Sequence, residues 1–190
     1  MGGHLHRMQE FARIIAENLF GKGRETPDSF VPSTIDDLYI STLLHDVGKV
    51  GIPDGILFKP GRLSSEEYMV MKTHATIGQD TIRKAQTYIG DESFLNMGVD
   101  IAGYHHERWD GKGYPTGMAG EKIPLASRIV SIADVYDALT SPRVYKAAWS
   151  HEETIEYMRK GKGTQFDPTM IDALEKVEQE FKKIRENWKD

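Results

Sequence analysis

The amino-acid sequence predicts an all-α domain of about seven helices. Through most of the 190 residues, apolar side chains recur at intervals of three and four, which is the spacing of one face of an α-helix. No segment shows the alternation of apolar and polar residues that is typical of a half-buried strand. Glycines and prolines interrupt the apolar pattern at a few places and divide it into separate helices.

The predicted helices follow one another along the whole chain. They are expected at residues 5–19, 33–47, 64–89, 91–105, 124–140, 150–160 and 168–187. Gly21 and Gly23 stop the first helix. Either Ser33 or Thr34 is expected to cap the second helix. The long third segment is expected to break near Gly78, because glycine weakens a helix interior.

The connections between these helices carry their own signals. Pro53 and Pro60 mark an extended stretch before the third segment. Residues 107–123 are rich in glycine and contain a proline, so we expect an ordered loop there rather than a regular element. Pro124 then suits the first turn of the helix that follows.

Length and composition limit the classes of function. The chain has the size of one domain, residues 1–190, and 39% hydrophobic residues suffice for a full core. Without cysteine there is no disulfide and no thiolate metal site. The net charge of −5 disfavours a broad nucleic-acid surface. No apolar run approaches the roughly 18 to 20 residues of a membrane helix, and no signal peptide opens the chain, so we expect a cytoplasmic protein.

The first chemical signal is the dipeptide His45-Asp46 in LLHDVGK, at the end of an apolar helix. It offers an imidazole nitrogen and a carboxylate that can bridge two cations. Lys49 follows one helical turn later and could neutralise phosphate charge. By itself, the dipeptide would fit a surface helix end equally well.

The second signal is His105-His106-Glu107, which opens the run HHERWDGKGYP. Two consecutive histidines point about 100° apart on a helix, so they share a metal only where the helix end lies directly against it. The alternative is a surface helix terminus, where histidine also suits the helix dipole. The run as a whole is far more specific than any dipeptide in it.

The third signal lies in the helix at residues 124–140, which is apolar nearly all round and therefore predicted to be buried. Asp134 and Asp137 lie on one side of it, three residues apart. A buried carboxylate needs a cation or strong hydrogen-bond donors. We expect Asp134 to bind a metal and Asp137 to form a salt bridge with Arg128 or Arg143.

His4 and His74 complete a candidate ligand set, although a single histidine on a helix is more often packed or solvated. The set is His4, His45, Asp46, His74, His105, His106 and Asp134. Its nitrogen and oxygen donors suit Fe or Mn, suit Zn or Ni less well, and disfavour Mg and Ca. Seven ligands exceed one site with an open position, so we expect two metals that share Asp46. One would take His4, His45 and Asp134, and the other would take His74, His105 and His106. His6 and His151 are expected to be surface residues.

These motifs together resemble the HD-GYP family, a branch of the HD superfamily of metal-dependent phosphohydrolases. HDVGK, the His74 segment, HHERWDGKGYP and IADVYDALTSPRVYK occur in the family's order and approximate spacing, over essentially the whole chain. The resemblance implies an HD-domain helical bundle with an ordered Gly-rich GYP loop. It also implies a di- or trinuclear iron or manganese centre, and hydrolysis of cyclic di-GMP (c-di-GMP) to pGpG and often on to GMP.

By position, the family's metal ligands match the seven residues of the set. Lys49, Arg143 and Lys146 match contacts to the substrate phosphates, and Tyr114 belongs to the loop that borders the substrate. A few converging cations allow an acidic protein to bind a dianion. Trinuclear members carry a glutamate four residues before the first ligand histidine. This position falls before Met1, so two metal ions are expected and a third is left open.

The expected mechanism follows from such a centre. Two metals roughly 3.5 to 4 Å apart would hold a bridging hydroxide, which attacks phosphorus in line and expels the ribose 3′-oxygen. The catalytic residues would be Asp46, which bridges the metals, and Lys49, which with Arg143 stabilises the added charge. Asp137 is expected to orient a metal ligand by hydrogen bonding to it, without binding the metal itself.

Two alternatives remain open beside this function. The ligand set would also serve another HD-type phosphohydrolase that acts on nucleotides such as dNTP or ppGpp, although the GYP loop argues against it. The chain could instead be a non-enzymatic c-di-GMP receptor or interaction module. The expected partner is c-di-GMP. A regulatory sensor or receiver domain N-terminal to this segment, and a protein that binds the GYP loop, are further candidates.

Overall fold

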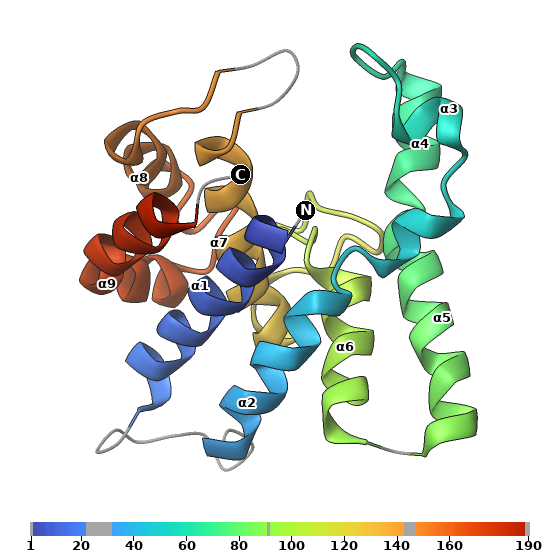
Figure 1. Ribbon diagram of the computed structural model, residues 1–190, viewed down its shortest axis with the longest axis horizontal. Helices are drawn as coiled ribbons and strands as arrows, with labels where there is room; N and C mark the ends of the chain where they lie inside the picture. Colours follow the sequence, from blue (N-terminus) through green and yellow to red (C-terminus); the bar gives the residue numbers. More distant parts are fainter. Residues whose placement is uncertain (1, 22–31, 91, 143–146, 189–190) are drawn as a thin grey trace.

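The computed structural model describes residues 2–21, 32–90, 92–142 and 147–188, and it is built from helices (Figure 1). The α-helices are α1 Gly2–Phe20, α2 Pro32–Ser41, α3 Asp54–Leu57, α4 Ser65–Lys72, α5 His74–Ile89, α6 Ser93–Tyr104, α7 Leu125–Thr140, α8 His151–Lys160 and α9 Pro168–Asn187. Three short 3-10 helices, η1 Thr42–Leu44, η2 Val47–Gly51 and η3 Gly120–Lys122, lie between them. Within the described ranges the only extended pairing is an isolated bridge between Lys162 and Phe166. The all-α prediction is confirmed.

Helix α7 lies inside the bundle. Helices α1, α6, α8 and α9 pack against it, and α2 packs between α1 and α6 (Figure 1). The main core forms where α1, α7 and α9 meet, and the rings of Phe11 and Phe181 stack there with centroids 4.4 Å apart. A smaller apolar cluster, which includes Ile82 and Val99, joins α5 to α6. The turn that follows α2 therefore lies between the main core and the smaller cluster, because η1 packs against α1 and α6 and η2 packs against α5.

The second predicted helix differs at both ends. The helix α2 begins at Pro32, so Ser33 and Thr34 lie inside it and the N-cap prediction is wrong. Proline suits a first helical turn because that turn does not use its own N–H groups. The α-helix ends at Ser41, and the chain continues through η1 and η2. The HDVGK motif thus lies in tight turns rather than in a regular helix.

The third predicted segment breaks at Thr73, between α4 and α5, and not near Gly78. Gly78 lies inside α5, where η2 packs against the helix. A Cβ atom built on Gly48 would lie 1.9 Å from the carbonyl oxygen of His74 and 2.9 Å from the Cα of Gly78. The two glycines therefore permit a close backbone approach. This approach holds the turn that carries His45 and Asp46, called the HD turn below, against the start of α5.

The loops agree with the sequence in outline and differ in detail. The stretch between Pro53 and Pro60 contains the one-turn helix α3 and is not simply extended. Residues 107–123 form an ordered loop that includes η3, as predicted. Pro124 is the N-cap residue of α7, directly before its first turn. None of the described helices combines the length and the apolar composition needed to cross a membrane.

Candidate metal centre

The structure brings the predicted ligands from five parts of the fold to one place. They are His4 in α1, His45 and Asp46 in the turn between η1 and η2, His74 at the start of α5, His105 and His106 after α6, and Asp134 in α7. Six of these seven form two groups that could hold a metal ion. In each group the ligand atoms lie within 4.8 Å of one another.

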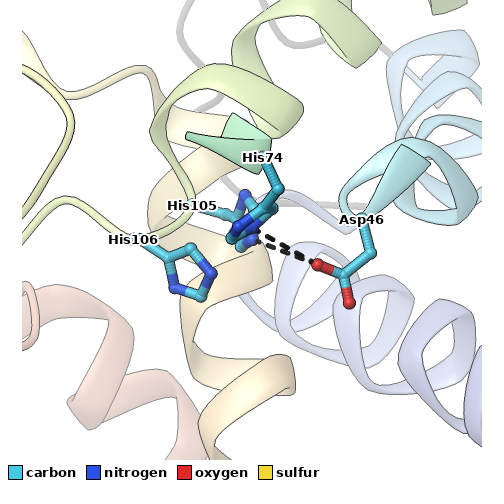
Figure 2. Close-up of side chains that lie close together, drawn as sticks. All are labelled: Asp46, His74, His105 and His106. Atoms are coloured by element: carbon cyan, nitrogen blue, oxygen red, sulfur yellow. Dashed lines mark ion pairs between the residues drawn. The ribbon is translucent and has the colours of Figure 1, made fainter. Parts of the chain in front are cut away.

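The two groups have one carboxylate in common. Figure 2 shows the first group, Asp46 with His74, His105 and His106. The second group consists of His4, His45 and Asp46. The histidines divide between the two groups as they do in the prediction, and Asp46 lies in both groups. Asp134 belongs to neither group, but it lines both cavities that adjoin them.

Three histidines are held in the same way by backbone carbonyl groups. The Nδ1 atoms of His45, His74 and His105 each lie 2.8 Å from a carbonyl oxygen, those of Thr42, Met71 and Ile101 respectively. A carbonyl can only accept, so each Nδ1 carries the proton and each Nε2 keeps its lone pair. These three Nε2 atoms are buried, and among the described residues they have no hydrogen-bond partner. Buried polar atoms are rarely left so, and three lone pairs beside one carboxylate suit a divalent cation.

The side chain of Asp46 faces these nitrogens with both oxygens. Its Oδ2 lies 3.3 Å from His45 Nε2, and its Oδ1 lies 3.5 Å from His74 Nε2 and 4.0 Å from His105 Nε2. Each oxygen is thus directed at a different histidine group. The ammonium group of Lys49 donates a hydrogen bond to Oδ2.

The protonation states fit metal binding. Burial raises the pKa of Asp46, but the contact with His45 and the nearby cations outweigh burial and hold that pKa far below its usual value. Burial lowers the pKa of His74 and His106, and it lowers that of His105 to about 4. Burial also lowers the pKa of His45, but the carboxylate of Asp46 outweighs this and the net pKa is raised. A carboxylate anion among mostly neutral imidazoles is the state that binds a cation.

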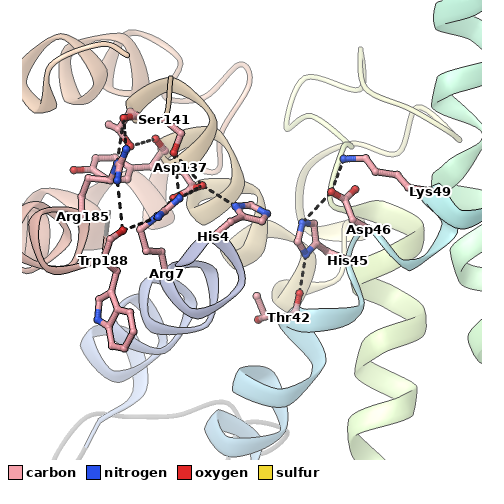
Figure 3. A network of polar contacts seen from close by, with 12 residues as sticks. His4, Arg7, Thr42, His45, Asp46, Lys49, Asp137, Ser141, Arg185 and Trp188 are labelled. Atoms are coloured by element: carbon pink, nitrogen blue, oxygen red, sulfur yellow. Dashed lines mark hydrogen bonds and ion pairs between the residues drawn. The ribbon is translucent and has the colours of Figure 1, made fainter. Parts of the chain in front are cut away.

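The second histidine group is supported by a buried ion pair that the sequence did not predict. Figure 3 shows His4 Nδ1 against Asp137 Oδ2, at a distance of 2.7 Å. The guanidinium of Arg7 is fully buried, and its Nε donates to Asp137 Oδ1 at 2.5 Å. A second nitrogen of Arg7 donates to the carbonyl oxygen of Trp188 at 2.6 Å. Asp137 therefore holds His4, and Arg7 holds Asp137.

The predicted partners of Asp137 need correction. Arg128 pairs instead with Asp167, at 2.6 Å, and Arg143 lies outside the described residues. The sequence does contain a signal for the actual partner. Arg7 follows His4 by three residues, so both side chains lie on the same face of α1.

Two cavities adjoin the histidine groups. A cavity of about 350 Å³ is lined by residues that include His105, His106, Asp134 and Tyr114. A second cavity of about 230 Å³ is lined by residues that include His4, Asp46, Lys49 and Asp134. Lys146, like Arg143, lies outside the described residues, so the structure gives no position for two of the predicted phosphate contacts.

A model of the HD domain family matches residues 4–170. The chain belongs to the HD domain family. A cyclic di-GMP phosphodiesterase from Vibrio cholerae is 46% identical over 189 residues, which cover 100% of this chain and 38% of that protein. A 3′3′-cGAMP-specific phosphodiesterase 2 from the same organism is 35% identical, over 100% of this chain and 34% of that protein. The chain thus spans well under half the length of these curated relatives.

A solved HDG"Y"P protein from Bdellovibrio bacteriovorus shares the fold. It matches 93% of this chain and 51% of its own chain, with a TM-score of 0.65 at 18% identity. With the motifs HDVGK and HHERWDGKGYP in place, the predicted HD-GYP branch of the HD family is confirmed. The histidine and aspartate cluster of this HD domain is suited to divalent metal ions.

The GYP loop of this HD domain is fixed at both sides. The ring of Tyr114 stacks on His106, with centroids 4.7 Å apart and planes inclined by 29°. Glu107 is buried, and its Oε1 accepts hydrogen bonds from the backbone N–H and the hydroxyl of Thr116 at 2.7 and 2.8 Å. No role for Glu107 was predicted from the sequence. Its place between the two histidines and the glycine-rich run was the available signal.

The two histidines predicted to be surface residues are partly buried and contact aromatic side chains. The ring of His6 lies against that of Trp188, with centroids 4.0 Å apart. His151 Nδ1 lies 2.8 Å from the hydroxyl of Tyr136. Neither histidine belongs to the ligand groups that the described residues form.

Proposed function

We propose that this chain is a metal-dependent phosphodiesterase that hydrolyses c-di-GMP to pGpG, and onward to GMP. The observation that carries the proposal is the set of three buried histidines whose unpartnered Nε2 atoms face the shared carboxylate of Asp46. The relatives named as cyclic di-GMP phosphodiesterases support the substrate. The chain spans only 38% of the first of these relatives, so we propose the activity of that protein for this chain and do not take it as shown.

We assign the residues of the two groups to two metal ions. His4, His45 and Asp134 would hold one ion, His74, His105 and His106 would hold the other, and Asp46 would contact both. The nitrogen and oxygen donors favour iron or manganese. Bound divalent cations supply Lewis acidity, which polarises a phosphoryl oxygen and lowers the pKa of a water nucleophile.

The remaining residues act on the phosphate and on the ligands. Lys49 lines the cavity beside Asp46, where its ammonium can stabilise the charge that develops on phosphorus. Arg143 and Lys146 are proposed as further phosphate contacts from their place in the family motif. Tyr114 borders the neighbouring cavity and would contact the bound nucleotide. Asp137 and Arg7 keep the ring of His4 turned toward the centre.

The wider setting is part of the same proposal. Residues 1–190 would form one catalytic domain in the cytoplasm, regulated by a sensor or receiver domain on its N-terminal side. A protein partner at the GYP loop is a further expectation. A relative named as 3′3′-cGAMP-specific makes a mixed cyclic dinucleotide the second candidate substrate.

The proposal is tested by metal analysis of anaerobically purified protein together with a c-di-GMP hydrolysis assay. We expect about two equivalents of metal and the release of pGpG. Asp46→Ala should abolish turnover and remove the second ion. Asp80→Ala is the matched control, because this aspartate is exposed on α5 and its ion pair with Arg83 is long, at 3.8 Å.

Three results would contradict the proposal. Metal-bound protein that leaves c-di-GMP intact and cleaves 3′3′-cGAMP would assign it the second substrate. Cleavage of dNTP or ppGpp alone would place it among other HD-type phosphohydrolases. Tight binding of c-di-GMP with neither metal nor product would identify a receptor.

A further inference from the structure

Helix α4 contributes two side chains to the surroundings of the metal groups. The ring of Tyr68 meets that of Tyr114 nearly at a right angle, with an interplanar angle of 79° and centroids 6.5 Å apart. The ammonium of Lys72 lies 5.3 Å from the centre of the Tyr68 ring and 5.6 Å from that of Tyr114. Two aromatic rings and one cation thus form a corner, with parts that come from α4 and from the GYP loop.

This corner is continuous with the first histidine group. One face of Tyr114 stacks on His106, and Tyr68 lines the same 350 Å³ cavity as His105, His106 and Asp134. The aromatic wall therefore starts at the metal group and runs outward along the cavity. A nucleotide whose phosphate lies at the metal group would have its base beside this wall.

Core packing does not explain Tyr68. Helix α4 contains no buried residue, and Tyr68 is 48% exposed. The helix is stabilised locally instead, by a capping box between Ser64 and Glu67. A half-exposed tyrosine that borders a cavity on such a helix is free to contact a ligand.

The charge around the cavity indicates what the ligand is. Within the part of the chain that the structure describes, neither Lys72 nor Lys112 forms an ion pair. The ammonium of Lys72 lies over two aromatic rings, and Lys112 lines the cavity. Unpaired ammonium groups beside aromatic rings suit a ligand that combines a π-system with negative charge. Nucleotide bases stack on aromatic side chains whatever their hydrogen-bonding edge, and purines offer the larger face.

We propose that Tyr68 and Lys72 form a base-binding wall for a purine of the cyclic dinucleotide substrate. Tyr68 stacks on the base. Lys72 keeps the rings of Tyr68 and Tyr114 in place through its cation–π contacts, and it attracts the phosphate that is not at the metal group. The inference rests on the proposed phosphodiesterase function and deepens it. It makes Tyr68 a specificity-determining residue that favours purine nucleotides over phosphodiesters without a base.

The test compares two substrates in three tyrosine variants. Tyr68→Ala removes the ring, Tyr68→Phe keeps it, and Tyr88→Ala removes a tyrosine that is 89% exposed on α5 and does not line the cavity. The substrates are c-di-GMP and bis(p-nitrophenyl) phosphate, a diester without a purine. Binding of c-di-GMP to metal-stripped protein, measured by calorimetry, separates recognition from turnover.

We expect Tyr68→Ala to lower kcat/KM for c-di-GMP about tenfold, mainly through KM, because one base–aromatic stack is lost. Its activity on bis(p-nitrophenyl) phosphate and its metal content should be unchanged. Tyr68→Phe and Tyr88→Ala should match the unaltered protein on both substrates. Lys72→Met should raise KM for c-di-GMP and make it less dependent on salt concentration.

The outcomes separate this inference from the proposed function. An equal loss on both substrates, or no loss with Tyr68→Ala in a protein that hydrolyses c-di-GMP, would overturn the inference alone. Binding of c-di-GMP that requires Tyr68, without any product whichever metal is supplied, would overturn the phosphodiesterase function and support the wall. Failure to bind and to hydrolyse would overturn both.

Discussion

Asp137 connects a candidate metal ligand to the far end of the chain. Its Oδ2 lies 2.7 Å from His4 Nδ1, and both of its oxygens accept from Arg7, which also donates to the carbonyl of Trp188 (Figure 3). The orientation of an imidazole in α1 thus depends on α7 and on the end of α9. A buried carboxylate in this position fixes the orientation of the ring that it contacts.

Arg7→Met should destabilise the protein strongly. The substitution leaves the buried carboxylate of Asp137 without its cation, and breaking a buried ion pair in this way costs about 3 to 5 kcal/mol. Urea unfolding measures the difference. Arg83→Met is the matched control, because its 3.8 Å pair with Asp80 is exposed and should be worth less than about 1 kcal/mol. Equal stability of the two variants would contradict the role assigned to Arg7.

Asp137→Asn should weaken metal binding while the fold is kept. The amide is neutral and holds His4 less firmly, and loss of such a partner typically lowers metal affinity about 10- to 100-fold. Metal titration of the stripped variant, followed by metal analysis, gives the result. We expect the ion near His4 to be lost first and the His74 group to retain its ion. Unchanged affinity for both ions would show that Asp137 has no part in the centre.

Gly48→Ala should displace the HD turn. The added Cβ would lie 1.9 Å from the carbonyl oxygen of His74, and backbone cannot move aside as a flexible side chain can. We expect a loss of about 1 to 3 kcal/mol in the free energy of unfolding, together with reduced metal content. Gly55→Ala, in α3, is the control, because its Cβ would meet no atom within 4 Å. If Gly48→Ala behaves like Gly55→Ala, the close approach of η2 and α5 is not required.

Removal of metal should lower the thermal stability. A ligand that binds only the folded state adds about 2.7 kcal/mol of stability at one hundred times its dissociation constant. Chelator-treated protein should therefore melt at a lower temperature, and added Mn²⁺ should restore the melting temperature. In Asp46→Ala both shifts should shrink, because the shared carboxylate is gone. Identical melting curves with and without metal would argue against the centre.

The helices were predictable because their signals are local. The apolar period of three to four located α1, α7, α8 and α9 within a few residues. The motif residues were predictable for another reason: HDVGK and HHERWDGKGYP contain adjacent histidine and aspartate or histidine residues, which are typical metal ligands. What failed depended on distant contacts. The third segment was expected to break near Gly78, but it breaks at Thr73. Gly78 lies inside α5, where it permits the close approach of η2.

The amino-acid sequence by itself determined the all-α class, the family and the residue types of the centre, since each can be read within a short stretch of chain. Only the tertiary structure decided that Asp134 lies outside both ligand groups of the described residues, and that Arg7 rather than Arg128 holds Asp137. Arg7 and Asp137 are 130 residues apart. A pair so distant in sequence meets only when α1 and α7 pack together, and no local pattern records which of several arginines will be buried there.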